Sequence, residues 1–430
     1  MTWYKFEPLD VILFREANPF SPGEGAWAKS IFPPMPITIF QAFRSAVASP
    51  ENNNQNESDT SKKNGVKLKF KGPFLLQKTS SGDVLWLPTP RDLLCVKECN
   101  ENSEDDQNSD KPEDSNNWLC LTCLQPLGEN IPEWEYVIHG CGSFTENQLL
   151  PMVPPSPSPD EGLCDNPPSK GKRECIGSSP KPWIKASVLA RYLEGESLSN
   201  PSKSQEKQST ESEDSQEDFF HDNPWEVQIL PHIQMQADKR QVKDEDGYFT
   251  EVSIRLHPNW SLVVECDVEI EESVVRLGGE GHRALISPLQ SFPDWDNLEK
   301  FTKPAENGSN KAYLLTPGLA QSHSQDYIYG VYPHAWANCL KSCVGDRAIL
   351  WGAKSVFSDK PMLPQRAFVA PGSVYIFKED VKDIGRVLPN HYFQADINKW
   401  QENLPKLNRE LKWLETLSSL NYGLLLWSRK

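Results

Sequence analysis

Residues 3–15 read WYKFEPLDVILFR, and this stretch decides the fold expected for the chain. Apolar side chains occur on both of its faces: Leu9, Val11 and Leu13 on one, and Phe6, Ile12 and Phe14 on the other. A strand that is apolar on both faces is typical of the centre of a sheet that is covered on both sides. The sequence therefore predicts a central strand over residues 3–15.

A loop and a helix are expected directly after this strand. The loop reads NPFSPGEGAWAKSIFPPMP, and Thr38 then stands three residues before Gln41, the spacing of a capping box. Ile39, Phe43 and Val47 recur at helical spacing and predict the buried stripe of this helix.

The charge of the chain is concentrated in two segments. The net charge is −16, and residues 97–117 and 196–222 each hold eight acidic and two basic residues. Few of their residues are apolar, so neither segment can offset the entropy of ordering, and both are expected to be disordered insertions. The remainder is close to neutral, so the acidic total does not exclude a nucleic-acid partner.

Length and cysteine content favour a cytoplasmic protein of two domains. The 430 residues contain no long apolar run and no secretory leader, so we expect no membrane span. The ten cysteines are then expected as free thiols or metal ligands rather than disulfides. Zinc is one alternative for the pairs Cys95/Cys99 and Cys120/Cys123, although strand alternation would turn the second pair to opposite faces.

Residues 226–256 carry the clearest hairpin pattern, two alternating runs around the segment DKRQVKDEDG. The tip is basic, and an aromatic pair, Tyr248 and Phe249, follows it. Such a tip suits contacts with phosphates and base faces. The alternative is an ordinary exposed hairpin whose aromatic side chains pack inward.

The segment LGGEGHRA (277–284) is the strongest local signal for binding. Three glycines in four positions, Gly278, Gly279 and Gly281, allow a ligand to approach the backbone amides closely. Successive amides in such a loop form an anion-binding concavity, to which His282 and Arg283 add donors. A tight turn without a ligand would explain the same pattern.

The opening block, the glycine loop and the hairpin together resemble the RAMP proteins of CRISPR systems. Within these proteins they are most similar to the subunit-three family of the type III-B (Cmr) effector complex, whose members hold the 5′ tag of the guide RNA. RAMP subunits commonly show Gly-Ala-x-Arg on the first helix, and here residues 41–44 read Gln-Ala-Phe-Arg. The turn in FVAPGSVYIF (368–377) has the form of another RAMP element.

The pattern of mixed strands and helices favours an α+β fold, and the resemblance implies two ferredoxin-like (RRM-like) domains with glycine-rich loops and a thumb-like hairpin. The first domain is expected over 1–290, the thumb over 226–256 and the second domain over 305–430. Insertions are expected near 50–64, 97–117, 149–174 and 196–222.

The resemblance also implies a set of RNA-binding residues, drawn from the opening block, the thumb, the glycine loop and the second domain. These are Gly23, Gly25, Lys29, Arg44, Lys239, Arg240, Lys243, Tyr248, Phe249, Gly278, Gly279, Gly281, His282, Arg283, Lys354, Arg366 and Gly372. No metal and no cofactor is expected.

The function implied is architectural: gripping the 5′ tag of the guide RNA, contacting the guide–target duplex, and docking on the large polymerase-like subunit and the first backbone RAMP subunit. The sequence shows no catalytic motif. The main alternative is a RAMP endoribonuclease that processes precursor guide RNA, with His282 as general acid or base. A stand-alone RNA-binding module is the third.

Overall fold

The computed structural model describes sixteen parts of the chain: 1–16, 27–47, 69–100, 118–127, 149–155, 162–164, 168, 171–200, 218–233, 235–236, 240–242, 248–289, 292–320, 330–352, 366–388 and 414–429. Strands dominate these residues and helices are few, so the fold is of the mixed α+β class that the sequence predicts.

The largest sheet has eight strands in the order β11-β10-β4-β3-β14-β1-β16-β15. They are β1 (Thr2–Pro8), β3 (Phe70–Thr79), β4 (Gly82–Pro88), β10 (Trp183–Lys185), β11 (Phe220–His221), β14 (Trp260–Cys266), β15 (Ser273–Arg276) and β16 (Arg283–Leu289). Tyr4 and Phe6 of β1 enter one buried cluster, whereas Trp3 enters another. The prediction of an internal strand covered on both faces is therefore confirmed.

The first strand is shorter than predicted, because it ends at Pro8 and the chain bends at Leu9, which is exposed. The Leu9 amide donates to the carbonyl of Arg283 at 3.0 Å. Residues 11–16 then contact other elements through isolated β-bridges, between Ile12 and Ile254 and between Arg15 and Ser30. This bend carries the chain from the large sheet to the hairpin.

The helices flank the sheets: α1 (Pro36–Val47), α3 (Ala186–Glu194), α4 (Pro293–Glu299), the 3-10 turns η7 (Lys300–Thr302) and η8 (His334–Trp336), and a helical segment at 414–419. Helix α1 begins at Pro36, whose fixed φ suits a first helical position. Thr38 therefore lies inside the first turn, and the predicted capping box is wrong. Of the predicted stripe, Ile39 and Phe43 are buried and Val47 is half-buried.

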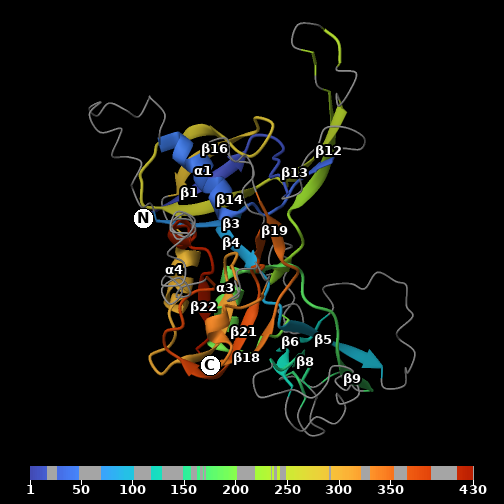
Figure 1. Cartoon of the computed structure of the whole chain (residues 1–430). Helices are drawn as coiled ribbons and strands as arrows, with labels where there is room; N and C mark the ends of the chain where they lie inside the picture. The colour runs from blue at the N-terminus through green and yellow to red at the C-terminus, as the bar shows by residue number, and fades with distance from the viewer. Residues whose placement is uncertain are drawn as a thin grey trace.

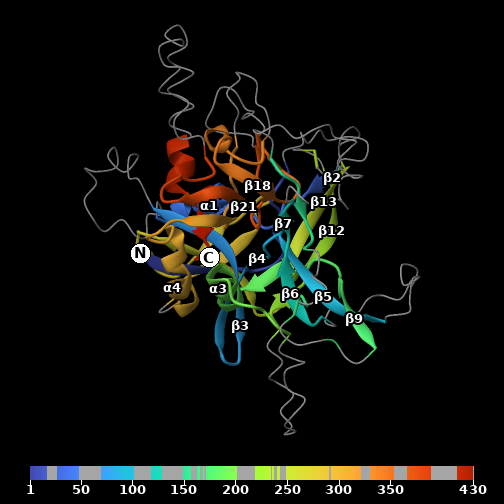
Figure 2. The same cartoon turned by 90° about the horizontal axis from the view of Figure 1, so that it is seen from below.

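The predicted hairpin is present as β12 (Trp225–Ile233) and β13 (Tyr248–Leu256), which pair along their whole length. It extends away from the rest of the molecule (Figure 1). A short strand, β2 (Trp27–Lys29), pairs parallel to β13 near its middle (Figure 2). The opening block and the hairpin thus share one three-stranded sheet.

Three of the predicted insertions include residues of ordered strands. Residues 97–100 belong to β5 (Leu93–Asn100), which lies between β6 (Cys120–Cys123) and β9 (Lys172–Ile176). The insertion near 149–174 contains β8 (Met152–Val153), which pairs with β7 (Gln125–Pro126), and it ends in β9. Residues 220–221 form β11, because Phe219 and Phe220 are buried against Trp118. Residues 101–117, 201–217 and all of 50–64 lie outside the described residues.

The C-terminal half contributes a four-stranded sheet of β17 (Ser309–Leu314), β18 (Leu340–Val344), β21 (Val374–Val381) and β22 (Leu425–Trp427), and the pair β19 (Ile349–Trp351) and β20 (Arg366–Phe368). Its side chains enter the same buried clusters as those of the first half; Tyr422, for example, packs with Phe43 in one cluster. No helix among the described residues has the length and apolar character needed to cross a membrane.

The run PWIKASVLARYLEG (182–195), with Pro182 near its start and Gly195 past its end, predicts a helix, and the structure has α3 there with a later start. Residues 183–185 are strand β10, and the helix begins at Ala186. Its predicted end is confirmed, since Gly195 takes the left-handed conformation (φ +75) that terminates many helices.

Candidate nucleic-acid interface

The glycine-rich loop is the turn that joins β15 to β16. Gly278 has a φ of +83, and a Cβ there would lie 2.4 Å from the carbonyl oxygen of Leu13. The Gly279 amide donates to that same oxygen at 2.8 Å. Gly278 is therefore required by backbone conformation and by close packing, and the loop is anchored on the segment that follows β1.

The exposed side of this loop offers donors for an anion. Within the described parts of the chain, the amides of Glu280 and Gly281 donate to no other group. Gly281 has a φ of +80 and open space around its Cα. At the base of the loop Arg276 stands directly opposite Arg283, both are exposed, and neither forms an ion pair with a described residue.

Two like charges opposite one another on neighbouring strands repel, and an anion bound between them would remove the repulsion. Phosphate is the anion that exposed arginines and loop amides recognise most often in concert. The acidic Glu280 of the same loop is neutralised by its ion pair with Arg15. The loop therefore presents a net positive surface.

A groove of about 340 Å³ lies on the large sheet beside the hairpin's base, and its lining mixes basic and acidic side chains. Arg255 is paired with Asp10 at 2.6 Å and Lys5 with Glu7 at 3.0 Å. The cations of this groove are largely neutralised, so the arginine pair at the loop is the stronger anion site.

A buried carboxylate lies beneath the loop. Glu251 of β13 is fully buried, and its Oε1 lies 2.6 Å from Nε2 of His282 while its Oε2 lies 2.8 Å from Nε2 of His232 on β12. Ser253 also donates to Oε1. Burial raises the pKa of the Glu251 carboxyl, but the hydrogen bonds from Ser253 and His282 outweigh burial, so that the pKa lies below its ordinary value.

The two aromatic residues at the start of β13 point to opposite faces of the hairpin sheet. Phe249 stacks on the His232 ring with centroids 4.8 Å apart, on the face that carries Glu251. Tyr248 is 67% exposed on the other face. Tyr248 and Phe249 therefore do not lie side by side on one face, as the predicted aromatic pair would require, because successive strand residues point to opposite faces.

The face that carries Tyr248 holds a residue that sequence reasoning missed. Trp27 of β2 is 52% exposed and stands opposite Thr250, the next residue of β13 on the Tyr248 face. Val227, Ile229 and Ile233 of β12 are exposed on the same face. Only the parallel pairing of β2 with β13 brings Trp27 here, and no local pattern signals that pairing.

The remaining predicted site residues fall into three groups. Lys29, Arg44 and Arg240 are exposed, on β2, on α1 and near the hairpin tip. Gly23, Gly25, Lys239, Lys243 and Lys354 lie outside the described residues. Arg366 and Gly372 differ from expectation, because both are buried.

Arg366 lies on β20 with 5% of its surface exposed, so it cannot present its guanidinium to RNA at the surface. Gly372 has a φ of +91, and a Cβ there would lie 2.8 Å from the carbonyl oxygen of Thr89. Its carbonyl accepts the Arg91 amide at 2.9 Å. The Pro-Gly turn at 371–372 is thus a packing contact between the two halves of the chain.

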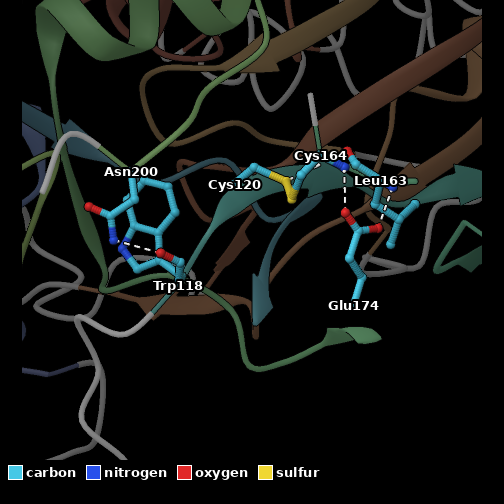
Figure 3. The surroundings of a disulfide bond; sticks show 6 residues. All are labelled: Trp118, Cys120, Leu163, Cys164, Glu174 and Asn200. Carbon is cyan, nitrogen blue, oxygen red and sulfur yellow. Dashed lines mark hydrogen bonds between the residues drawn. A yellow bond between two sulfur atoms is a disulfide. The ribbon is translucent and has the colours of Figure 1, made fainter. Parts of the chain in front are cut away.

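The cysteines expected as free thiols or zinc ligands are partly paired. Cys120 forms a disulfide with Cys164, and Cys99 forms one with Cys175. Figure 3 shows the first, where Glu174 accepts the amides of Leu163 and Cys164. The predicted pairs Cys95/Cys99 and Cys120/Cys123 therefore form no zinc site, because one member of each is in a disulfide with a cysteine distant in sequence.

The unpaired thiols of this region are poor nucleophiles. Burial raises the pKa of Cys95 to about 11, and burial together with Asp92 raises that of Cys123 to about 12. Among the residues that the structure describes, no group of three or more His, Cys, Asp or Glu side chains could hold a metal ion.

Comparison with known proteins gives a family and several similar structures. The model of the family described as CRISPR-associated protein (Cas_Cmr3) matches residues 4–429. A chain of type III-B Cmr-beta bound to cognate target RNA and AMPPnP has a TM-score of 0.43 at 10% identity, covering 96% of this chain and 94% of that one. No curated protein matches the chain.

Two further structures show comparable likeness. A chain of type III-B Cmr-beta bound to cognate target RNA has a TM-score of 0.39 at 12% identity, covering 98% of this chain and 96% of that one. A chain of the Csm3-Csm4 subcomplex of the type III-A CRISPR-Cas interference complex has a TM-score of 0.31 at 12% identity, with 89% and 95% covered.

Proposed function

Because the chain belongs to the Cas_Cmr3 family of CRISPR-associated proteins, we infer that it is a non-catalytic, RNA-binding subunit of a type III-B effector complex. In this proposal it grips the 5′ tag of the guide RNA in the cytoplasm and docks on the large polymerase-like subunit and the first backbone subunit. Target sequence would be read by base pairing rather than by the protein.

The observation that carries the proposal is the arginine pair at the glycine loop. Arg276 and Arg283 stand opposite each other and exposed, next to the amides of Glu280 and Gly281. A single-stranded 5′ end exposes successive phosphates, because no complementary strand covers it. Such an end can therefore contact a small loop of this kind more readily than a duplex can.

The hairpin supports a second part of the proposal. We assign to it the role of a thumb that contacts the guide–target duplex, with Tyr248 and Trp27 offering exposed rings to bases. The two halves of the chain are interpreted as RAMP domains of ferredoxin-like type, over 1–290 and 305–430.

The contact between His282 and Glu251 is compatible with one enzymatic alternative. A carboxylate that holds an imidazole is a common arrangement for a general acid or base. The alternative is an endoribonuclease acting on precursor guide RNA, and it predicts a discrete cut of a repeat-containing transcript that is lost in His282→Ala. We expect no such cut, because both oxygens of Glu251 and the His282 Nε2 are already engaged with each other or with His232.

The principal test compares guides with and without the 5′ tag in the assembled complex. Arg276→Ala with Arg283→Ala should weaken binding of tagged guides about tenfold or more. The salt slope should fall by about 1.4 on a log–log plot, since each phosphate contact on a single strand contributes about 0.7. Arg191→Ala is the control, a half-buried arginine on α3 that is paired with Glu196 and lies outside the loop.

Guides without the tag should bind the wild type and the double variant equally, because the lost contacts belong to the tag. An equal loss for tagged and untagged guides would place the arginine pair on another part of the RNA. No loss for either guide would remove the loop from the RNA interface and overturn the proposal.

A further inference from the structure

Glu251 joins two elements that the proposed function treats as separate contacts with RNA. One oxygen meets His282, which belongs to the glycine loop between β15 and β16, and the other meets His232 on β12 of the hairpin. These residues are distant in sequence, and the carboxylate between them has no exposed surface. The loop and the hairpin therefore meet at one buried charge.

The positions of His282 and His232 depend on each other through Glu251. A buried carboxylate is costly unless hydrogen bonds and neighbouring cationic groups compensate it, and Glu251 obtains these contacts from three elements. Ser253 lies on its own strand, but the two imidazoles come from the loop and from β12. If either imidazole moves away, the carboxylate loses part of its stabilisation and pulls less strongly on the other.

The ring of His232 is itself held in place. It stacks nearly parallel on Phe249, with an interplanar angle of 8°. On the loop side, the ion pair of Glu280 with Arg15 and the amide of Gly279 bound to Leu13 fix the turn against the segment after β1. Both ends of the connection are therefore held by contacts outside the carboxylate itself.

We propose that Glu251 is a positioning residue that couples the glycine loop to the hairpin, so that ordering of either one orders the other. Only the consequence of this coupling rests on the proposed function: binding of the 5′ tag by the loop and contact of the hairpin with the duplex are cooperative. The mechanical coupling is a property of the free chain.

Amide hydrogen exchange on the full chain tests the coupling without RNA. His232→Phe keeps the ring that stacks on Phe249 but removes the imidazole nitrogen that lies 2.8 Å from Oε2 of Glu251. We expect exchange of the hydrogen-bonded loop amides to become about tenfold faster, equivalent to about 1.4 kcal/mol of lost protection. These are the amides of Leu277, Gly279 and His282.

Two controls make the result specific. His257→Ala alters a half-buried histidine that lies 3.9 Å from Glu226, outside the cluster, and should leave the loop unchanged. In a Glu251→Gln background, His232→Phe should have no further effect on the loop, because the connection is already broken. Unchanged loop exchange in His232→Phe, or an equal effect with and without Glu251→Gln, would overturn the proposal.

Failure of the coupling and failure of the proposed function are distinguishable. If the exchange result holds but Arg276→Ala with Arg283→Ala leaves tagged-guide binding intact, the coupling stands and the RNA assignment is wrong. If the arginine variants lose tagged-guide binding but His232→Phe leaves the loop amides protected, the RNA assignment stands and the coupling is wrong.

Discussion

Gly278 and Gly281 share the left-handed region of φ but differ in their surroundings. At Gly278 a side chain would collide with the backbone of Leu13, whereas at Gly281 it would enter open space. One glycine is therefore needed by the fold, and the other leaves room at the exposed surface where a ligand would lie.

Substitution should separate these two roles. Gly278→Ala should destabilise the protein by about 2–4 kcal/mol, since it combines positive-φ strain with a backbone collision. Gly281→Asn, which tolerates positive φ, should change stability by less than about 1 kcal/mol and should weaken tagged-guide binding. Urea denaturation and gel shift measure the two effects. Equal destabilisation by both variants would contradict this division.

At the residue scale, the glycine pattern was sufficient to predict a loop with exposed donors at the correct place. Arg276 could not be predicted, because its position opposite Arg283 depends on the register between β15 and β16. The burial of Arg366 could not be predicted either, because the neighbouring sequence gives no sign that all three residues of β20 are buried.

At the element scale, the hairpin shows how far alternation can predict structure. The alternating apolar residues of 226–256 were sufficient to predict two strands and which side chains share a face. They could not show that this face is exposed at Val227, Ile229 and Ile233 yet buried at Ile254, where the segment after β1 packs. Exposure depends on tertiary neighbours that a local period does not encode.

Paired substitutions on this face should therefore differ. Ile254→Ala should cost about 2–5 kcal/mol, because it empties a buried position in the main cluster. Ile229→Thr should change stability by no more than about 0.5 kcal/mol, since its side chain is 55% exposed and threonine keeps the β-branch. Urea midpoints measure both, and a large loss in Ile229→Thr would mean that the hairpin face is covered in solution.

At the scale of the whole molecule, the two halves are joined by buried polar contacts as well as by shared cores. Asp92, next to β5, is fully buried, and its Oδ2 lies 2.6 Å from Nζ of Lys311 on β17. Tyr192 of α3 donates to Oδ1 at 2.7 Å. This contact connects the C-terminal sheet to the first half of the chain.

The Lys311 amine is charged at neutral pH. Burial lowers the pKa of the Lys311 amine, but attraction to the Asp92 carboxylate outweighs burial, and the pKa lies above its ordinary value. The Lys311 ammonium also lies 4.3 Å from the centre of the Tyr192 ring. Sequence alone offers no route to this pair, since its members are separated by more than half of the chain.

Removing one charge of the Lys311–Asp92 pair should destabilise the protein more than removing both charges. Lys311→Met leaves the Asp92 carboxylate buried without its cation and should cost about 3–5 kcal/mol. Adding Asp92→Asn removes that charge and keeps an acceptor for Tyr192, so the double variant should recover a large part of the loss. Urea denaturation of both single variants and the double variant gives the coupling energy. If the two single losses simply add, the Lys311–Asp92 pair contributes no coupling energy between the halves.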